Sequence, residues 1–422
     1  MQNFLNSPTR KRLAENFLSL STLQAVNYFL PLITLPYLVR ILGPEKFGLI
    51  AFAQAFIGYF IVFTDYGFNL SATREVSIHR DEKEKISEIF NSVMAVKFLL
   101  GMLSFIILAL ILTFIPKFGN DWLVYIFAFG MVLGNILFPV WFFQGMEKMK
   151  YITILNIVAK GIFTISIFIF IREMADYVYV PLINSMSFIV AGGLSLGAVF
   201  KDFGINFKLP TLENIKHQLK EGWHIFISTA AISLYTTSNA FILGIFTNNT
   251  IVGYYSAAEK IVRAVRGLLT PISQTVYPYI SKLASESKER ALNFIRKLVK
   301  VLGAGTFILS LFLFVLAAPI VNIVLGKQYQ PSIIVLQILA FLPFIIGLAT
   351  VYATLFLLSF GHTRVWSRII ITCSALHIIF LLVFIGVLSL AHVGVSISWL
   401  LTEICVLIWS YLSYRKLTYA HR

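Results

Sequence analysis

IVGYYSAAEKIVRAVRGLLTPISQTVYPYISK, residues 251–282, is the stretch that decides the fold of this chain. It is longer than the roughly 20 residues that an α-helix needs to cross a bilayer. At about 100° per residue, its polar side chains gather on one face of a helix: Glu259, Arg263, Arg266, Thr270, Ser273, Gln274 and Tyr277. Each central charge costs about 3 kcal/mol in lipid, so this face must meet water or protein. The stretch therefore predicts a polar, net-positive cavity inside a bundle of membrane helices.

The composition is that of a helical membrane protein. The 422 residues are 58% hydrophobic and 13% charged, with a mean hydropathy of +0.83. A soluble domain has about 45–50% apolar and about 25% charged residues. The net charge is +15. Much of such a charge in a membrane protein is a topology signal, and no soluble basic domain is evident that would bind nucleic acid.

The apolar segments predict about twelve spans, six on each side of a polar connector at residues 201–222. We expect an all-α protein with an N-terminal lobe (1–200), a cytoplasmic linker with an interfacial helix (201–222) and a C-terminal lobe (223–422). The expected spans lie near 16–40, 47–72, 90–115, 122–143, 151–171, 177–200, 223–247, 250–278, 299–325, 332–358, 368–390 and 393–413. The run Phe47–Gln54 is echoed by Val252–Glu259, with glycine and alanine at equivalent positions, as in parallel repeats around a central cavity.

Lysine and arginine residues set the orientation. Of the 34, 24 fall in one set of alternate loops, 5 in the other set and 5 within spans. The positive-inside rule therefore predicts that both termini are cytoplasmic. The outer loops are short, and no phosphate-binding loop of the form G-x-x-x-x-G-K-[ST] occurs. We expect a protein that acts within the membrane without its own ATPase.

Isolated polar residues inside other spans are further candidates. Lys97 and Lys160 either line the cavity or extend to the cytoplasmic surface, and Asp65 either acts in transport or pairs with Lys97. Glu403 admits a structural role, as a partner of His377 or of a lysine. Neither His377 nor His392 has a second ligand three or four residues further along the chain, so we expect neither a metal site nor another cofactor.

The cavity chemistry favours an anionic solute. Arginine presents a planar fork that binds phosphate oxygens at two points. The residues alone therefore predict a transporter for an anionic or phosphorylated solute.

Three motifs resemble a known family. They are the run from Asn16 to Pro44 with PLITLPYLVRILGP at its end, the run FGLIAFAQ at 47–54 with TDYGF at 64–68, and the stretch 253–282 quoted above. Together they resemble the O-antigen flippases, the Wzx-type polysaccharide transporters of the multidrug/oligosaccharidyl-lipid/polysaccharide (MOP) exporter superfamily. The resemblance covers nearly the whole chain.

This resemblance implies two six-helix lobes around a central cationic lumen in the bacterial inner membrane. It implies a non-enzymatic flippase that moves an undecaprenyl-pyrophosphate-linked oligosaccharide from the cytoplasmic to the periplasmic leaflet by alternating access. The implied substrate-binding residues are Arg263 and Arg266, followed by Arg40, Lys97, Lys160 and Gln274. Asp65 and Glu259 are candidates for ion coupling. The implied partners are membrane lipids, a polysaccharide polymerase and a chain-length regulator.

Two other functions compete with this interpretation. An ion-coupled multidrug or small-molecule exporter of the same superfamily would bind cations, whereas the intramembrane charges here are mostly basic. A membrane polysaccharide polymerase would need a larger extramembrane loop or a membrane-face cleft for its catalytic residues than the outer loops provide.

Overall fold

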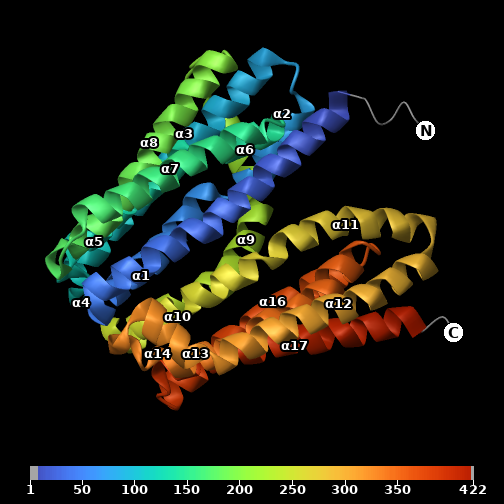
Figure 1. Ribbon diagram of the computed structural model, residues 1–422. Helices are drawn as coiled ribbons and strands as arrows, with labels where there is room; N and C mark the ends of the chain where they lie inside the picture. Colours follow the sequence, from blue (N-terminus) through green and yellow to red (C-terminus); the bar gives the residue numbers. More distant parts are fainter. Residues whose placement is uncertain (1–7, 420–422) are drawn as a thin grey trace. The chain divides into compact units, whose positions relative to one another are not determined.

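The structure is a computed structural model that describes the backbone of residues 8–419. It describes their side chains except at 8–25, 28, 29, 231, 232, 234–236, 271, 274, 275 and 419. All regular secondary structure in residues 8–419 is helical, as the sequence predicts (Figure 1).

The helices follow one another with short connections. Those of the N-terminal half are α1 (Pro8–Asp65), α2 (Phe68–Ile78), α3 (Lys83–Phe114), α4 (Pro116–Gly119), α5 (Trp122–Leu137), α6 (Val140–Gly145), α7 (Met149–Phe170), η2 (Met174–Val178) and α8 (Tyr179–Asp202). Those of the C-terminal half are α9 (Leu212–Phe246), α10 (Asn249–Gly267), α11 (Leu269–Glu286), α12 (Lys288–Val315), α13 (Ala317–Ile320), η3 (Val321–Leu325), η4 (Lys327–Tyr329), α14 (Ser332–Leu339), α15 (Leu342–Ala349), η5 (Thr350–Leu358), α16 (Thr363–Leu381), η6 (Leu382–Val387) and α17 (Ala391–Tyr419).

Nine helical segments within the described residues are long and apolar enough to cross a membrane. Two expected spans are joined in the first of them, Leu30–Ile78. Within the described residues, the expected span at 223–247 yields only the shorter apolar segment Thr237–Phe246 and is not among the nine. The expected span at 250–278 is not among them either. It consists of two helices, α10 and α11, that meet at Leu268, and α10 carries charged side chains that lower its hydropathy. The chain is a multi-pass membrane protein, and its total of twelve spans remains a prediction.

Helix α1 is bent at Gly43. This glycine has φ 66° and ψ 174°, a conformation that a residue with a Cβ rarely adopts. Pro44 follows and cannot donate a backbone hydrogen bond. The bend therefore separates the two expected N-terminal spans, although the helix resumes at once and continues to Asp65.

The chain forms two compact units. Unit 1 contains residues 1–30 and 53–233, and unit 2 contains residues 31–52 and 234–422. In unit 1, α5 and α8 pack closely, and the Ser195 hydroxyl donates to the Leu137 carbonyl oxygen at 3.0 Å. Small residues allow such close packing of membrane helices, where hydrogen bonds rather than the hydrophobic effect hold neighbours together.

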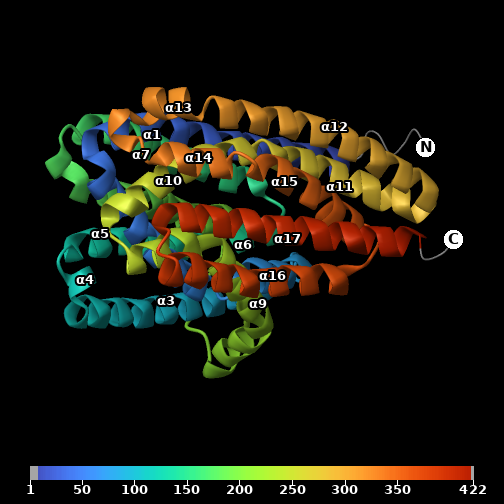
Figure 2. The same cartoon turned by 90° about the horizontal axis from the view of Figure 1, so that it is seen from below.

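In unit 2, residues 31–52 of α1 pack against α10, and α16 lies alongside α17 (Figure 2). Val351, Leu355 and Phe356 of η5 are buried together with Ile369 of α16. Unit 2 also contains buried polar contacts: His377 of α16 joins α9 and α17, and Tyr255 pairs with Glu259 on α10.

The polar connector leads into α9. The Thr211 hydroxyl accepts a hydrogen bond from the Asn214 backbone nitrogen at 3.3 Å, which is an N-cap contact. The helix that begins there continues as one element to Phe246, well past Gly222.

Candidate functional site

The polar face of α10 carries an ion pair at its centre. Arg263 donates from Nη2 to Oε1 of Glu259 at 2.9 Å, and Tyr255 donates its hydroxyl to the same oxygen at 3.4 Å. The three residues are spaced four apart, so they lie in one row of the helix. The Glu259 side chain is 9% exposed, whereas the Arg263 side chain is 49% exposed. A buried carboxylate thus holds an arginine whose side chain is half-exposed.

Arg266 lies one turn further on and packs against an aromatic ring. Its Cζ atom is 5.3 Å from the centroid of the Trp399 ring of α17, which is a cation–π contact. The Trp399 indole nitrogen donates to Oε1 of Glu403 at 3.2 Å. The Nε atom of Arg266 is buried, and within the described part of the chain it has no hydrogen-bond partner. Trp399 therefore fixes the position of Arg266 and is itself fixed by Glu403.

A fully buried histidine connects three helices below this row. His377 Nδ1 lies 2.9 Å from Oγ1 of Thr402, and its Nε2 lies 2.8 Å from Oδ1 of Asn239. Both ring nitrogens thus have neutral partners. These contacts make His377 a bridge between α9, α16 and α17.

In unit 1, Asp65 and Lys97 form an ion pair of their own. Lys97 Nζ is 2.9 Å from Oδ1 of Asp65 and 3.4 Å from both oxygens of Asn135. Lys97 is almost completely buried, while the Asp65 side chain is 20% exposed. Lys97 therefore does not extend to the surface. It neutralises Asp65 inside unit 1.

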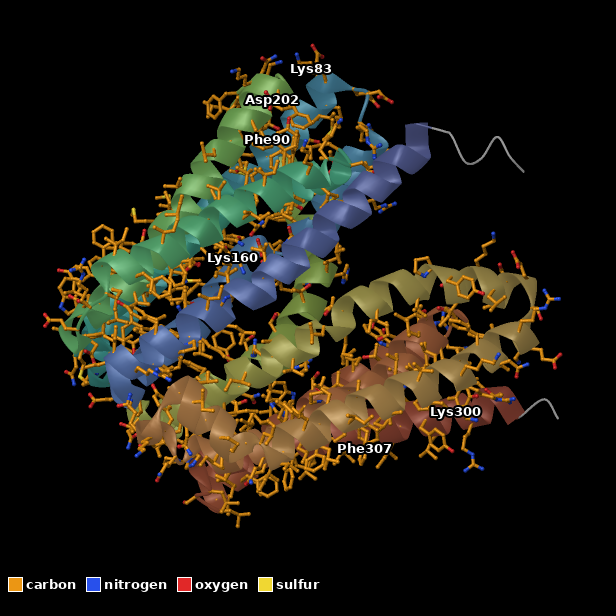
Figure 3. All side chains as sticks on the ribbon, viewed as in Figure 1. Lys83, Phe90, Lys160, Asp202, Lys300 and Phe307 are labelled. Carbon is orange, nitrogen blue, oxygen red and sulfur yellow. The ribbon has the colours of Figure 1, made fainter. Side chains whose placement is uncertain are left out.

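The other predicted residues differ in their surroundings. Arg40 is exposed and donates to the carbonyl oxygen of Ile323, so it supports the η3 turn. Lys160 is half-buried midway along α7 (Figure 3), and no hydrogen bond or ion pair reaches it from the residues described. Gln274 lies on α11, but its side chain is outside the described residues. The structure therefore brings Glu259, Arg263 and Arg266 together on α10, whereas Arg40 contacts Ile323 of η3.

The relationship to known proteins is clear at the family level. The model of the family described as "Polysaccharide biosynthesis protein" matches residues 13–284. The chain belongs to this family. A protein of Escherichia coli (strain K12), provisionally named an O-antigen transporter, is 37% identical over 395 residues, covering 93% of this chain and 94% of the relative. A protein of the same provisional name from Shigella dysenteriae is 31% identical, covering 94% of this chain and 98% of the relative.

A solved structure shares the fold. The inward-facing conformation of a multidrug resistance MATE family transporter of the MOP superfamily matches with a TM-score of 0.72. It is 14% identical and covers 93% of this chain and 96% of its own. At that identity the likeness concerns the fold alone, and it agrees with the predicted all-α fold.

Several partners at the site were missed in the sequence. Tyr255, Asn239, Thr402 and Trp399 were not singled out, although each contacts or adjoins a predicted residue. Their signal was spacing: Tyr255 lies four residues before Glu259, and Trp399 lies four residues before Glu403. Such pairs share a helix face. The contacts between α9, α16 and α17 have no comparable local signal.

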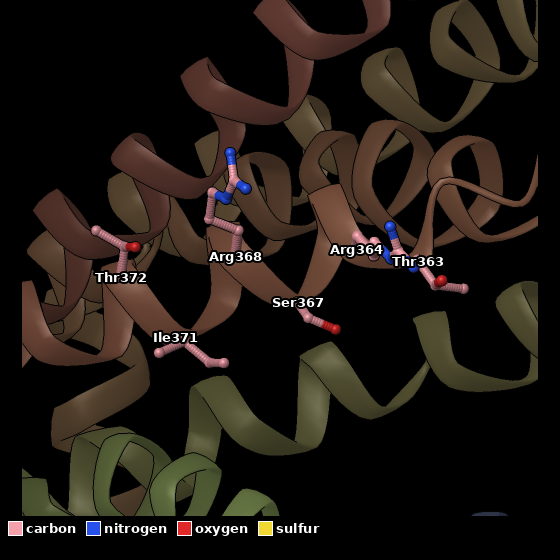
Figure 4. A pocket seen from close by; sticks show the side chains of 6 residues that line it. All are labelled: Thr363, Arg364, Ser367, Arg368, Ile371 and Thr372. Carbon is pink, nitrogen blue, oxygen red and sulfur yellow. The ribbon is translucent and has the colours of Figure 1, made fainter.

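A second basic feature lies at the beginning of α16. A pocket of about 500 Å³ is lined by Thr363, Arg364, Ser367, Arg368, Ile371 and Thr372. Figure 4 shows that all six side chains come from this helix, with Ser367 and Ile371 on one side and Arg368 on the adjoining side. In the sequence, the two arginines counted only as orientation signals.

Proposed function

We propose that the protein is a flippase for undecaprenyl-pyrophosphate-linked oligosaccharides such as O-antigen repeat units, and that it moves them from the cytoplasmic to the periplasmic leaflet. Family membership supports transport in polysaccharide biosynthesis, and the provisional name of the two relatives points to O-antigen. The observation that carries the proposal for this chain is the α10 row, in which buried Glu259 holds the half-exposed guanidinium of Arg263.

The row fits the charged part of such a substrate. A pyrophosphate offers several oxygens to guanidinium forks, and charge-assisted bonds of this kind are stronger than neutral ones. Arg263 and Arg266 stand one turn apart, so two phosphates of one group could each meet one of them. We propose that they receive the pyrophosphate, with Gln274, Lys97, Lys160 and Arg40 as further contacts.

Transport in this proposal follows alternating access. The substrate site opens to the cytoplasmic side, receives the pyrophosphate, and then opens to the periplasmic side. The halves 1–200 and 223–422, linked by 201–222, are the proposed moving parts, except that residues 31–52 move with the C-terminal half because they pack against α10. Both termini are cytoplasmic in this proposal. Asp65 and Glu259 are the proposed residues for coupling to an ion, because each carboxylate lies in a partly buried ion pair whose protonation would release a basic partner.

We propose that the protein catalyses no chemical step. Its proposed protein partners are a polysaccharide polymerase and a chain-length regulator.

A strain lacking its own O-antigen flippase tests the proposal. Wild-type protein should restore surface polysaccharide, while Arg263→Ala/Arg266→Ala at the same protein level should not. Restoration by the double variant would remove these arginines from the mechanism. Accumulation of a fluorescent cationic drug by proteoliposomes would instead indicate a multidrug exporter.

A further inference from the structure

The exposed face of α16 is built from two adjacent rows of side chains. Thr363, Ser367 and Ile371 form one row, and Arg364, Arg368 and Thr372 form the other, since residues four apart lie above one another on a helix. We propose that this pocket binds the phosphate or diphosphate group of a membrane lipid. The inference rests on the proposed function for the identity of one such lipid, the substrate, but on its own residues for the site.

The two arginines of the pocket favour the binding of an anion. Arg364 and Arg368 are both exposed, and within the described chain neither forms an ion pair with a carboxylate. Two like charges one turn apart repel each other. A phosphate group between them would remove this repulsion and accept from both forks. The hydroxyls of Thr363, Ser367 and Thr372 supply further donors at the same face.

The polarity of the face changes along the helix. The row that begins with Thr363 and Ser367 continues with Ile371, Ala375 and Ile379, all of which are exposed. A polar head placed at the arginines would thus have its hydrocarbon chain beside aliphatic side chains. This order suits an amphiphile with a phosphate head rather than a free inorganic anion. It also agrees with the predicted orientation, in which Arg364 and Arg368 lie at the cytoplasmic end.

Binding assays in detergent micelles test the site without requiring transport. The probes are farnesyl diphosphate, phosphatidylglycerol and uncharged farnesol, measured by thermophoresis. In an Arg263→Ala/Arg266→Ala background, where the α10 arginines no longer contribute, Arg364→Gln/Arg368→Gln should weaken farnesyl diphosphate binding at least tenfold and leave farnesol binding unchanged. The matched control is Arg296→Gln/Lys300→Gln, which removes an exposed basic pair of the same spacing from α12 and should change affinity less than twofold.

The comparison of probes identifies the source of the phosphate. If the substitutions weaken only the binding of farnesyl diphosphate, the pocket is assigned to the lipid-linked substrate. If they weaken phosphatidylglycerol binding equally, the pocket also binds the headgroups of bilayer lipids. Arg364→Lys/Arg368→Lys, which keeps the charge but not the fork, should recover only part of the affinity. Farnesyl diphosphate binding that Arg364→Gln/Arg368→Gln leaves unchanged in the Arg263→Ala/Arg266→Ala background would overturn the proposal.

The Arg263→Ala/Arg266→Ala background separates this site from the α10 arginines. The α16 pocket should still bind farnesyl diphosphate there, and the α16 substitutions should still weaken it. Failure of the pocket leaves the proposed flippase activity intact, because that activity is measured by transport.

Discussion

Gly48 and Gly253 meet where residues 31–52 cross α10, and neither has space for a side chain. A Cβ atom on Gly253 would lie 2.0 Å from the carbonyl oxygen of Pro44, and one on Gly48 would lie 2.5 Å from the nitrogen of Gly253. These two glycines occupy equivalent positions in the echoed runs at 47–54 and 252–259. The echo therefore marks a contact at which two backbones approach each other directly.

Gly253→Ala should destabilise the protein. The added methyl group must displace backbone, and overpacking of this kind costs about 1–3 kcal/mol. Gly305→Ala on α12 is the matched control, because nothing lies within 4 Å of its Cβ position and alanine favours a helix over glycine. Thermal unfolding in detergent should show a lower midpoint for Gly253→Ala and no loss for Gly305→Ala. Equal midpoints would contradict the described crossing.

Lys97→Met should be strongly destabilising. It would leave the Asp65 carboxylate without its basic partner, and breaking a buried pair in this way costs about 3–5 kcal/mol. Replacing both partners, as in Asp65→Asn/Lys97→Met, should recover most of that stability. Unfolding midpoints check both expectations.

Transport by the stable double variant then separates structure from coupling. Normal transport by Asp65→Asn/Lys97→Met would make the pair structural and remove Asp65 from ion coupling. Loss of transport in the folded variant, together with loss of its dependence on an ion gradient, is the result expected from the proposed role.

Trp399 should matter for substrate affinity through Arg266. Trp399→Leu removes the ring beneath the guanidinium, and a cation–π contact contributes about 0.5–2 kcal/mol. Trp399→Phe keeps a ring but loses the donor to Glu403. We expect Trp399→Phe to weaken substrate binding slightly and Trp399→Leu to weaken it more. In an Arg266→Ala background, neither substitution should change the binding much. An equal effect of Trp399→Leu with and without Arg266 would show that the tryptophan acts by packing alone.

His377→Leu should lower stability by about 1–3 kcal/mol, because Asn239 and Thr402 would lose a buried hydrogen-bond partner. His362→Leu, at the half-buried N-cap position of α16, provides the comparison. Unfolding midpoints should fall for His377→Leu only. A stable His377→Leu variant would mean that the bridge between α9, α16 and α17 is not needed for folding.

The sequence predicted those parts of the site that depend on helical spacing. Glu259, Arg263 and Arg266 share a face in any α-helix, and the structure pairs Glu259 with Arg263 as this face allows. The position of Trp399 beneath Arg266 could not be predicted in the same way, since the two residues are far apart in sequence. The break at Leu268 was also missed, although Gly267 ends α10 and Pro271 follows, and both residues are common where a helix stops.

The grouping of residues 31–52 with unit 2 is a second feature without a local signal. Hydropathy places this segment in the N-terminal half, and only its packing against α10 shows where it belongs. In the polar connector, Thr211 caps a helix as N-cap preferences indicate. The length of that helix depends on packing and could not be deduced from its cap.

The most direct test of the account is translocation of a defined undecaprenyl-pyrophosphate-linked oligosaccharide by purified protein in proteoliposomes. The wild type should move the lipid between leaflets, and Arg296→Gln/Lys300→Gln should match it. Arg263→Ala/Arg266→Ala should reduce the rate roughly a hundredfold or more, since each charge-assisted hydrogen bond lost costs about 1.5–3 kcal/mol. Wild-type translocation by folded Arg263→Ala/Arg266→Ala protein would contradict the central claim.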